Sequence, residues 1–199
     1  KCLREIIGLH GYAPNKDPSI FSYRFFHEAC NNERVTEGVL RYLIKYFPGA
    51  SRSIEMEVVT TPLHCICCNK NVTLGMVQLL IDAYPDSLSR ADLNGQLPLI
   101  QLCGNQEIDE DVWLEILKYF IERCPESVRH TDNIGSLPLH PAAEKQSPEF
   151  CRILIEAYPG SEQITGVQGI LPFHWATYNT VATVKYLRQA QMKCTVGEI

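Results

Sequence analysis

Apolar residues recur at every third or fourth position in four segments of the chain, which is the period of one face of an α-helix. The segments read VLRYLIKYFP, MVQLLIDAYP, ILKYFIERCP and CRILIEAYP, and they end at Pro48, Pro85, Pro125 and Pro159. Because proline cannot continue a helix, each segment predicts an amphipathic helix that ends just before its proline.

A second pattern, Pro-Leu-His or a variant of it, alternates with these segments. Its five copies are 37, 36, 40 and 34 residues apart, by subtraction of their third positions. We expect each copy to open a short first helix that precedes an amphipathic second helix. The copies are Phe25-Phe26-His27, Pro62-Leu63-His64, Pro98-Leu99-Ile100, Pro138-Leu139-His140 and Pro172-Phe173-His174.

Helix-capping residues support the same period. Counting twelve residues back from the closing prolines gives Thr36, Thr73, Trp113 and Ser147. The three hydroxyl residues are good N-caps, because the side-chain oxygen can accept a hydrogen bond from an unpaired amide. In the longer third unit we expect the acidic run at 109–111 to cap the helix instead, and in the last unit Thr180 falls at the matching place.

Glycine marks a turn before three of the first helices. Gly95, Gly135 and Gly169 each precede the sequence x-Leu-Pro, where glycine lets the chain take a positive φ in a hairpin-like turn, or finger. Two helices and a finger per unit, stacked side by side, make a helical solenoid.

This arrangement resembles the ankyrin repeat, whose unit carries Thr-Pro-Leu-His-x-Ala. Residues 61–64 match with the threonine, and residues 137–143 and 171–176 match with leucine in its place. The resemblance covers about residues 20 to 190, in slightly long units like those of diatoms and related algae. It implies an all-α, ankyrin-type helical solenoid of about five helix-turn-helix units with short finger loops. We expect a single domain over 1–199, with an N-terminal flank at 1–20 and units at about 21–57, 58–94, 95–134, 135–168 and 169–199.

Three departures from the ankyrin pattern stand out. The first unit has Phe25-Phe26 for Pro-Leu, the third has Ile100 for histidine, and the last lacks the closing proline. Such departures fit terminal or irregular units, which must meet solvent or a cap.

Composition narrows the class of protein. Apolar residues make up 45% and charged residues 21% of the chain, which is typical of a soluble folded protein. The net charge of −5, without a basic run, argues against a nucleic-acid partner. No apolar run approaches the roughly 20 residues of a membrane-spanning helix, so we expect no membrane insertion. The odd number of cysteines leads us to expect an intracellular, cytoplasmic protein.

The nine cysteines favour reduced thiols, because they are odd in number and the chain is too large to need disulfides. One column of the repeat reads Cys30, Cys67, Cys103, Ala143 and Thr177, which predicts small core residues. Neighbouring units lie about 10 Å apart, too far for a disulfide. Cys151 occupies another core position. Cys65 and Cys68 form a Cys-x-x-Cys pair beside His64 and remain open to a metal or redox role.

The remaining chemical motifs favour a non-enzymatic protein without a cofactor. The histidines of the Pro-Leu-His copies form a ladder along the solenoid, and the resemblance implies that they hydrogen-bond backbone in the connecting loop. The acidic run at 109–111 could bind a divalent cation, although a helix start explains it more simply. No nucleophile elbow, Gly-rich phosphate loop or zinc-protease motif is present.

In ankyrin proteins the finger tips and first-helix ends contact the partner, so the resemblance implies a protein-protein interaction module that binds a protein or peptide on its concave surface. Leu93, Ile134, Val167 and Ile170 would recur along one apolar ridge, with Trp175 and Tyr178 at its end. Alternatively, Val167 and Ile170 pack on the next finger and Trp175 covers the end of the array. A thiol- or metal-responsive protein and a structural subunit of a large assembly also remain open. The predicted partner-binding residues are Leu93, Asn94, Gln96, Asn133, Ile134, Ser136, Val167, Gln168, Ile170, Trp175 and Tyr178.

Overall fold

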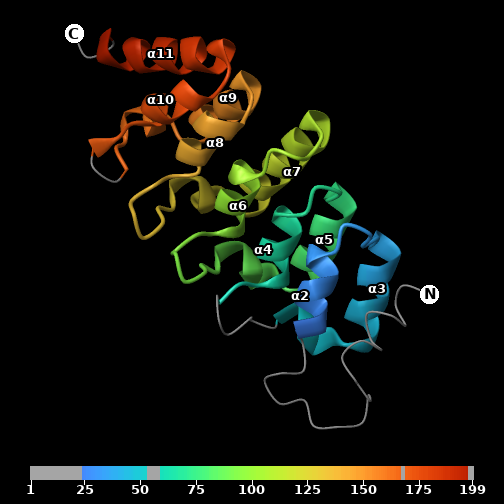
Figure 1. The fold of residues 1–199 in the computed structure, drawn as a ribbon. Helices are drawn as coiled ribbons and strands as arrows, with labels where there is room; N and C mark the ends of the chain where they lie inside the picture. The colour runs from blue at the N-terminus through green and yellow to red at the C-terminus, as the bar shows by residue number, and fades with distance from the viewer. Residues whose placement is uncertain (1–23, 53–58, 167–168, 197–199) are drawn as a thin grey trace.

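The computed structural model describes residues 24–52, 59–166 and 169–196, and these residues form an all-α structure (Figure 1). Within these ranges the regular elements are α-helices and short 3-10 helices, with no strand. None of these helices has both the length and the apolar character needed to cross a membrane. The predicted all-α class is therefore confirmed.

In the described part of the chain the helices follow one another as five pairs, each with a short first helix and a second helix. In Figure 1 the pairs run in order from α2 and α3 (blue) at one end to α10 and α11 (orange and red) at the other. The first helices are α2 (Arg24–Asn31), α4 (Pro62–Cys67), α6 (Pro98–Gly104), α8 (Leu139–Lys145) and α10 (Pro172–Trp175). The second helices are α3 (Glu37–Tyr46), α5 (Leu74–Ala83), α7 (Glu110–Arg123), α9 (Pro148–Ala157) and α11 (Val181–Val196).

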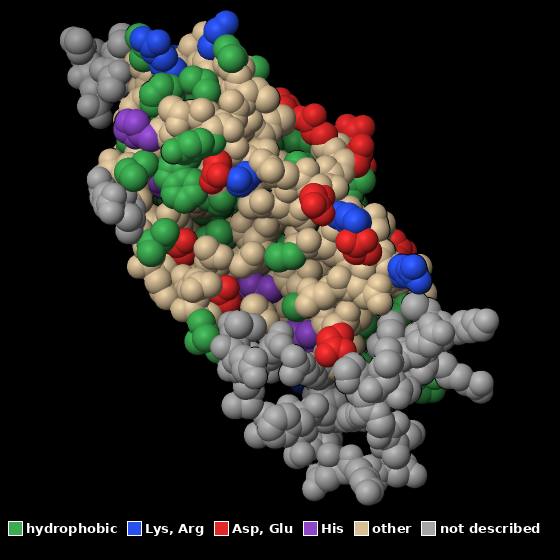
Figure 2. Space-filling model, viewed as in Figure 1, with side chains coloured by type: hydrophobic (Ala, Val, Ile, Leu, Met, Phe, Trp, Pro, Cys, Tyr) green, Lys and Arg blue, Asp and Glu red, His purple; other side chains and the backbone are tan. Residues whose placement is uncertain are grey.

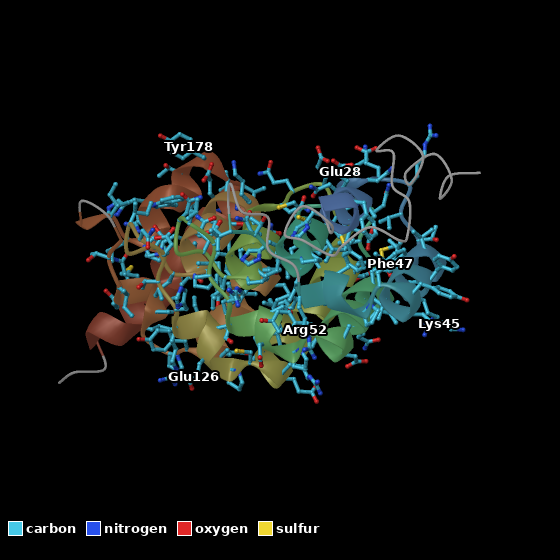
Figure 3. All side chains as sticks on the ribbon, turned by 90° about the horizontal axis from the view of Figure 1, so that it is seen from below. Glu28, Lys45, Phe47, Arg52, Glu126 and Tyr178 are labelled. Atoms are coloured by element: carbon cyan, nitrogen blue, oxygen red, sulfur yellow. The ribbon has the colours of Figure 1, made fainter. Side chains whose placement is uncertain are left out.

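These pairs build two layers. Each first helix packs on the first helix of the next pair, each second helix on the next second helix, and the two helices of a pair on each other. The largest fully buried side chains, among them Phe26, Ile66, Leu99 and Phe120, lie between the layers. Figure 3 shows the two long edges: Glu28 and Tyr178 lie along one edge, and Glu126 lies on the opposite edge.

The predicted helix starts are confirmed. The hydroxyls of Thr36, Thr73 and Ser147 accept hydrogen bonds from the third following amide, and Asp109 caps α7 through the amide of Asp111. Thr180 accepts a bond from the amide of Thr183 at the start of α11, at 3.3 Å. These caps satisfy amides that have no partner within the helix.

The segments after α3, α5, α7 and α9 form short 3-10 helices. Three of the closing prolines open 3-10 helices, because proline is favourable at a first helical position. After Pro85 and Pro125, Ser87 and Ser127 donate to the carbonyls of Tyr84 and Cys124, both at 2.6 Å. The 3-10 helices are η1 (Pro48–Arg52), η2 (Pro85–Ser89), η3 (Pro125–Arg129), η4 (Ser161–Gln163) and η6 (Ala176–Tyr178).

The column of small residues lies in the core. Cys30, Cys67, Cys103 and Ala143 are fully buried free thiols or methyl groups, as predicted, whereas Thr177 in the last pair is exposed. Burial raises the pKa values of the Cys30, Cys67 and Cys103 thiols well above their usual range. Burial likewise raises the pKa of Cys151 on α9 to about 12, which keeps this thiol protonated.

Candidate protein-binding face

The fingers are tight turns that precede α6, α8 and α10. In residues 92–96 the Asp92 carboxylate accepts bonds from the amides of Asn94 at 2.9 Å and Gln96 at 2.8 Å. Asp132 plays the same part in residues 132–136. The predicted positive φ is present at Gly95, at Gly135 and at Gly169, with values of 73°, 76° and 72°.

The third finger, residues 166–170, begins with glycine where the other two have aspartate. A Cβ atom on Gly166 would lie only 3.2 Å from Ser136 Oγ and 3.3 Å from His140 Nε2. The neighbouring finger and helix therefore leave little room for a side chain there. The backbone still closes the turn through the Gly166 amide, which donates to the Ile170 carbonyl at 2.9 Å.

Adjacent fingers are joined to each other. The backbone amide of Asn133 donates to the Asn94 carbonyl at 2.9 Å, and its side-chain amide donates to the Leu93 carbonyl at 2.8 Å. Gln96 Nε2 lies 3.3 Å from Asp132 Oδ2. These contacts fix the first two fingers against each other, so their tips are held rigidly.

The histidine ladder ties the first and third fingers to the first helices before them, whereas α6, before the second finger, has Ile100 at the histidine position. The Nδ1 atoms of His64 and His140 accept bonds from the amides of Thr61 and Leu137, at 3.1 Å and 3.0 Å. Their Nε2 atoms therefore carry the proton and donate to the carbonyls of Gln96 at 3.0 Å and Ile170 at 3.3 Å. His27 Nε2 reaches the Thr60 carbonyl in the same way, at 3.1 Å. The backbone role that the resemblance implies is confirmed for these three histidines.

Two further sets of structural hydrogen bonds were missed by the sequence analysis. Gln146 donates to the carbonyls of Cys103 and Asn105, and Asn69, Asn105 and Asn179 likewise donate to the ends of the preceding first helices. The sequence does contain a signal for these bonds, because asparagine recurs five residues after the third position of four Pro-Leu-His copies, at Asn32, Asn69, Asn105 and Asn179. In addition, His130 Nε2 donates to the Gly95 carbonyl at 2.7 Å, a contact that no repeat column predicts.

The predicted partner-binding residues differ in exposure. Leu93 and Ile134 are 57% and 49% exposed at the tips of adjacent fingers, and Tyr178 is 84% exposed. Asn94 and Asn133 are exposed, and Gln96, Ile170 and Trp175 are half-buried. Ser136 is only 3% exposed, so its side chain is buried in the turn. Val167 and Gln168 lie outside the described residues.

A pocket of about 510 Å³ lies at the C-terminal end of this face, between α8, the third finger and α10. Trp175 packs edge-on against the His140 ring, with 5.9 Å between the ring centroids, which fixes one wall. Figure 2 shows apolar (green) and histidine (purple) surface adjoining at this end of the molecule. We call the exposed finger tips and this pocket together the finger face. The pocket is lined by Glu144, Gly169, Ile170, His174, Trp175, Thr177 and Tyr178.

The Cys-x-x-Cys pair occupies α4 and its C-terminal end. Cys65 is buried, whereas Cys68 is exposed and lies 3.5 Å from Gln101 Oε1. Partial burial and the nearby Asp92 carboxylate raise the pKa of the Cys68 thiol, which is the opposite of what a reactive thiolate needs. Among the described residues, no group of three or more His, Cys, Asp or Glu side chains is placed to hold a metal ion.

Comparison with known proteins adds no relative: no protein-family model matches the chain, and no curated protein matches it. The geometry of the finger face therefore carries the functional argument. The finger face has hydrogen-bonded turns with exposed apolar tips, the half-buried side chain of Trp175, and the pocket beside it.

Proposed function

We propose that the chain is an ankyrin-type solenoid of five helix pairs that works as a protein-binding scaffold without catalytic activity. The ordered packing of the helix pairs, the glycine turns and the histidine-to-finger hydrogen bonds support this architecture. Each feature follows a column of the sequence, so one period accounts for the helices, the turns and the contacts between them.

The partner binds along the finger face. The observation that carries this proposal is the exposure of Leu93 and Ile134 at the tips of adjacent fingers that are hydrogen-bonded to each other. Exposed apolar side chains on rigid supports lose little conformational entropy on binding, and burying them releases ordered water. Trp175 and Tyr178 belong to the residue types that most often anchor interfaces.

Charges on the finger face favour a neutral, apolar contact. The carboxylates of Asp92 and Asp132 already accept backbone amide bonds within their own turns. Glu144 at the rim of the pocket pairs with Lys145 at 2.6 Å. With these carboxylates satisfied, the apolar tips and the pocket are the main source of binding energy.

The double substitution Leu93→Ser with Ile134→Ser tests the proposal. We expect affinity capture with the native chain to recover a partner, and the double variant to bind that partner at least about tenfold more weakly, since about 1.5–3 kcal/mol is lost per buried side chain. Tyr46→Ser is the matched control, because Tyr46 is also an exposed apolar residue, at 56%, but lies on α3 in the other layer. Equal binding by the native chain and the folded double variant would refute the finger face as the interface.

A further inference from the structure

The histidine of the last described helix pair has a donor that no described residue accepts. His27, His64 and His140 each use Nε2 to bond a backbone carbonyl of the segment that follows their helix pair. His174 occupies the same position in the last described pair, where its Nδ1 accepts a bond from the Leu171 amide at 3.0 Å. The proton is therefore on Nε2, which is a hydrogen-bond donor as in the other pairs.

The Nε2 atom of His174 has no acceptor among the residues that the structure describes. The imidazole is exposed and lines the pocket of about 510 Å³ at the end of the finger face. In the earlier pairs the matching donor meets a main-chain carbonyl at 3.0 to 3.3 Å. A carbonyl acceptor would complete the same contact at His174.

The walls of the pocket define the rest of the occupant. Ile170, Trp175 and Tyr178 supply apolar and aromatic surface. The polar groups beside them are already engaged, because Thr177 Oγ1 donates to the His174 carbonyl at 2.7 Å and Glu144 pairs with Lys145. A charged ligand therefore finds no unpaired counter-charge, whereas a neutral amide with a large apolar side chain matches both the donor and the surface.

We propose that the pocket binds a peptide segment of the protein partner, whose main-chain carbonyl accepts a hydrogen bond from His174 Nε2 while its large apolar side chain fills the space between Ile170, Trp175 and Tyr178. This inference rests on the proposed function and names the chemistry of the partner at one end of the finger face. The carbonyl takes the place relative to His174 that the Gln96 carbonyl has relative to His64.

A minimal probe tests the proposal directly. The probe is N-acetyl-phenylalanine N-methylamide, titrated into the labelled native chain while NMR follows the His174 Nε2 and Trp175 indole signals. We expect saturable shifts of both signals, and at least about fivefold weaker binding of N-acetylglycine N-methylamide, which keeps the carbonyls but lacks the side chain. Saturation at neither signal, or equal binding of the two probes, would overturn the proposal.

Three variants separate the pocket from general effects on the fold. His174→Ala and Tyr178→Ser should each weaken the phenylalanine probe by about threefold or more, since each removes one contact of the occupant. Tyr178 is almost fully exposed, so its replacement leaves the core intact, and Tyr46→Ser on α3 should bind the probe like the native chain. If folded His174→Ala and Tyr178→Ser bind the probe like the native chain, the probe binds elsewhere and the proposed occupant of the pocket is wrong.

The two proposals fail in different experiments. If the probe does not bind but the Leu93→Ser, Ile134→Ser variant loses its captured partner, the finger face stands and the occupant of the pocket is wrong. If the probe binds through His174 while the double variant keeps its partner, the pocket proposal is supported and the finger tips are not part of the interface.

Discussion

Single residues with two simultaneous partners hold the fingers in place. His64 accepts a bond from the amide at the start of its own helix and donates to the carbonyl of the next finger. His140 makes the same two contacts, with the Leu137 amide and with the Ile170 carbonyl of the third finger. The contact with the amide requires a neutral ring, because both nitrogens of an imidazolium carry protons and neither can accept a bond. Protonation of His64 or His140 should therefore disturb the position of the finger that the histidine holds.

The pH dependence of stability follows from this requirement. Burial, the largest cause, lowers the pKa values of His64 and His140 below the usual 6.5. The unfolded chain then binds more protons, so this stabilisation is present above about pH 6.5 and is lost as the pH falls through the lowered values. We predict that the free-energy difference between the native chain and His64→Gln, measured by urea unfolding, shrinks from pH 7.5 to pH 5. A constant difference would mean that protonation of this ring does not matter.

Glycines with a positive φ differ in how closely neighbours approach them. Gly95 has φ of 73°, and an added Cβ would lie 2.9 Å from the backbone nitrogen of Asn133. Gly160 has φ of 89° but no atom within 4 Å of that position. We predict that Gly160→Ala costs about 1–2 kcal/mol of unfolding free energy from the left-handed conformation alone. Gly95→Ala should cost at least about 1 kcal/mol more from the clash; equal losses in urea unfolding would contradict the close packing of the fingers.

Sequence predicts the residues whose role is local better than those whose role depends on the neighbouring unit. Thr36, Thr73 and Ser147 cap their own helices, and a cap is defined by a few consecutive residues. Ser136 was assigned to the surface because it adjoins a finger glycine, but the side of the turn that faces inward depends on the packing of the whole finger. The side-chain amides of Asn69, Asn105, Gln146 and Asn179 donate to carbonyls of the preceding unit, so the sequence of one unit does not reveal these acceptors. We call these four residues the amide ladder.

At the level of elements, the short first helices need help from their neighbours. The carbonyls at the C-terminal end of a helix have no partner within it, and a helix of six to eight residues has many such groups for its length. Asn69, Asn105, Gln146 and Asn179 supply amide donors from the next pair. This ladder closes the ends of the first helices and sets the distance between successive pairs.

Gln146→Leu tests the amide ladder. Gln146 is 2% exposed, and its Nε2 donates to the carbonyls of Cys103 at 2.9 Å and Asn105 at 2.8 Å. Leucine preserves most of the volume but leaves both carbonyls without this donor, so we predict a loss of about 2–4 kcal/mol in unfolding free energy. Gln101→Ala on α6 is the control, because that amide bonds only other side chains, and we expect a loss within about 1 kcal/mol. Similar losses for both variants would contradict the ladder.

The 3-10 helices are the elements that the sequence analysis did not predict. Proline at 48, 85 and 125 signals the end of the preceding helix, but it is equally suited to begin a short new one. Ser87 and Ser127 then stabilise the tight turn through bonds to the carbonyls three residues back. A pattern of three to five residues is too short to show a helical period, so the sequence does not indicate these turns.

At the scale of the whole molecule, the order of helix pairs along the array follows from the period of the sequence. Recurrent columns predict which helices are alike, and like helices pack on each other in two layers. The pocket could not be predicted in this way. Its walls come from the end of α8, the third finger and α10, and their juxtaposition depends on the twist between the last two pairs.

The most direct test of the central claim, that the finger face binds a protein partner, is site-specific photo-cross-linking. A benzoylphenylalanine at position 93 or 134 should cross-link to one and the same partner in an extract, because both tips lie on adjacent, hydrogen-bonded fingers. The same group at position 46 on α3, in the other layer, should not. Cross-links to that partner from position 46, with none from 93 and 134, would contradict the account.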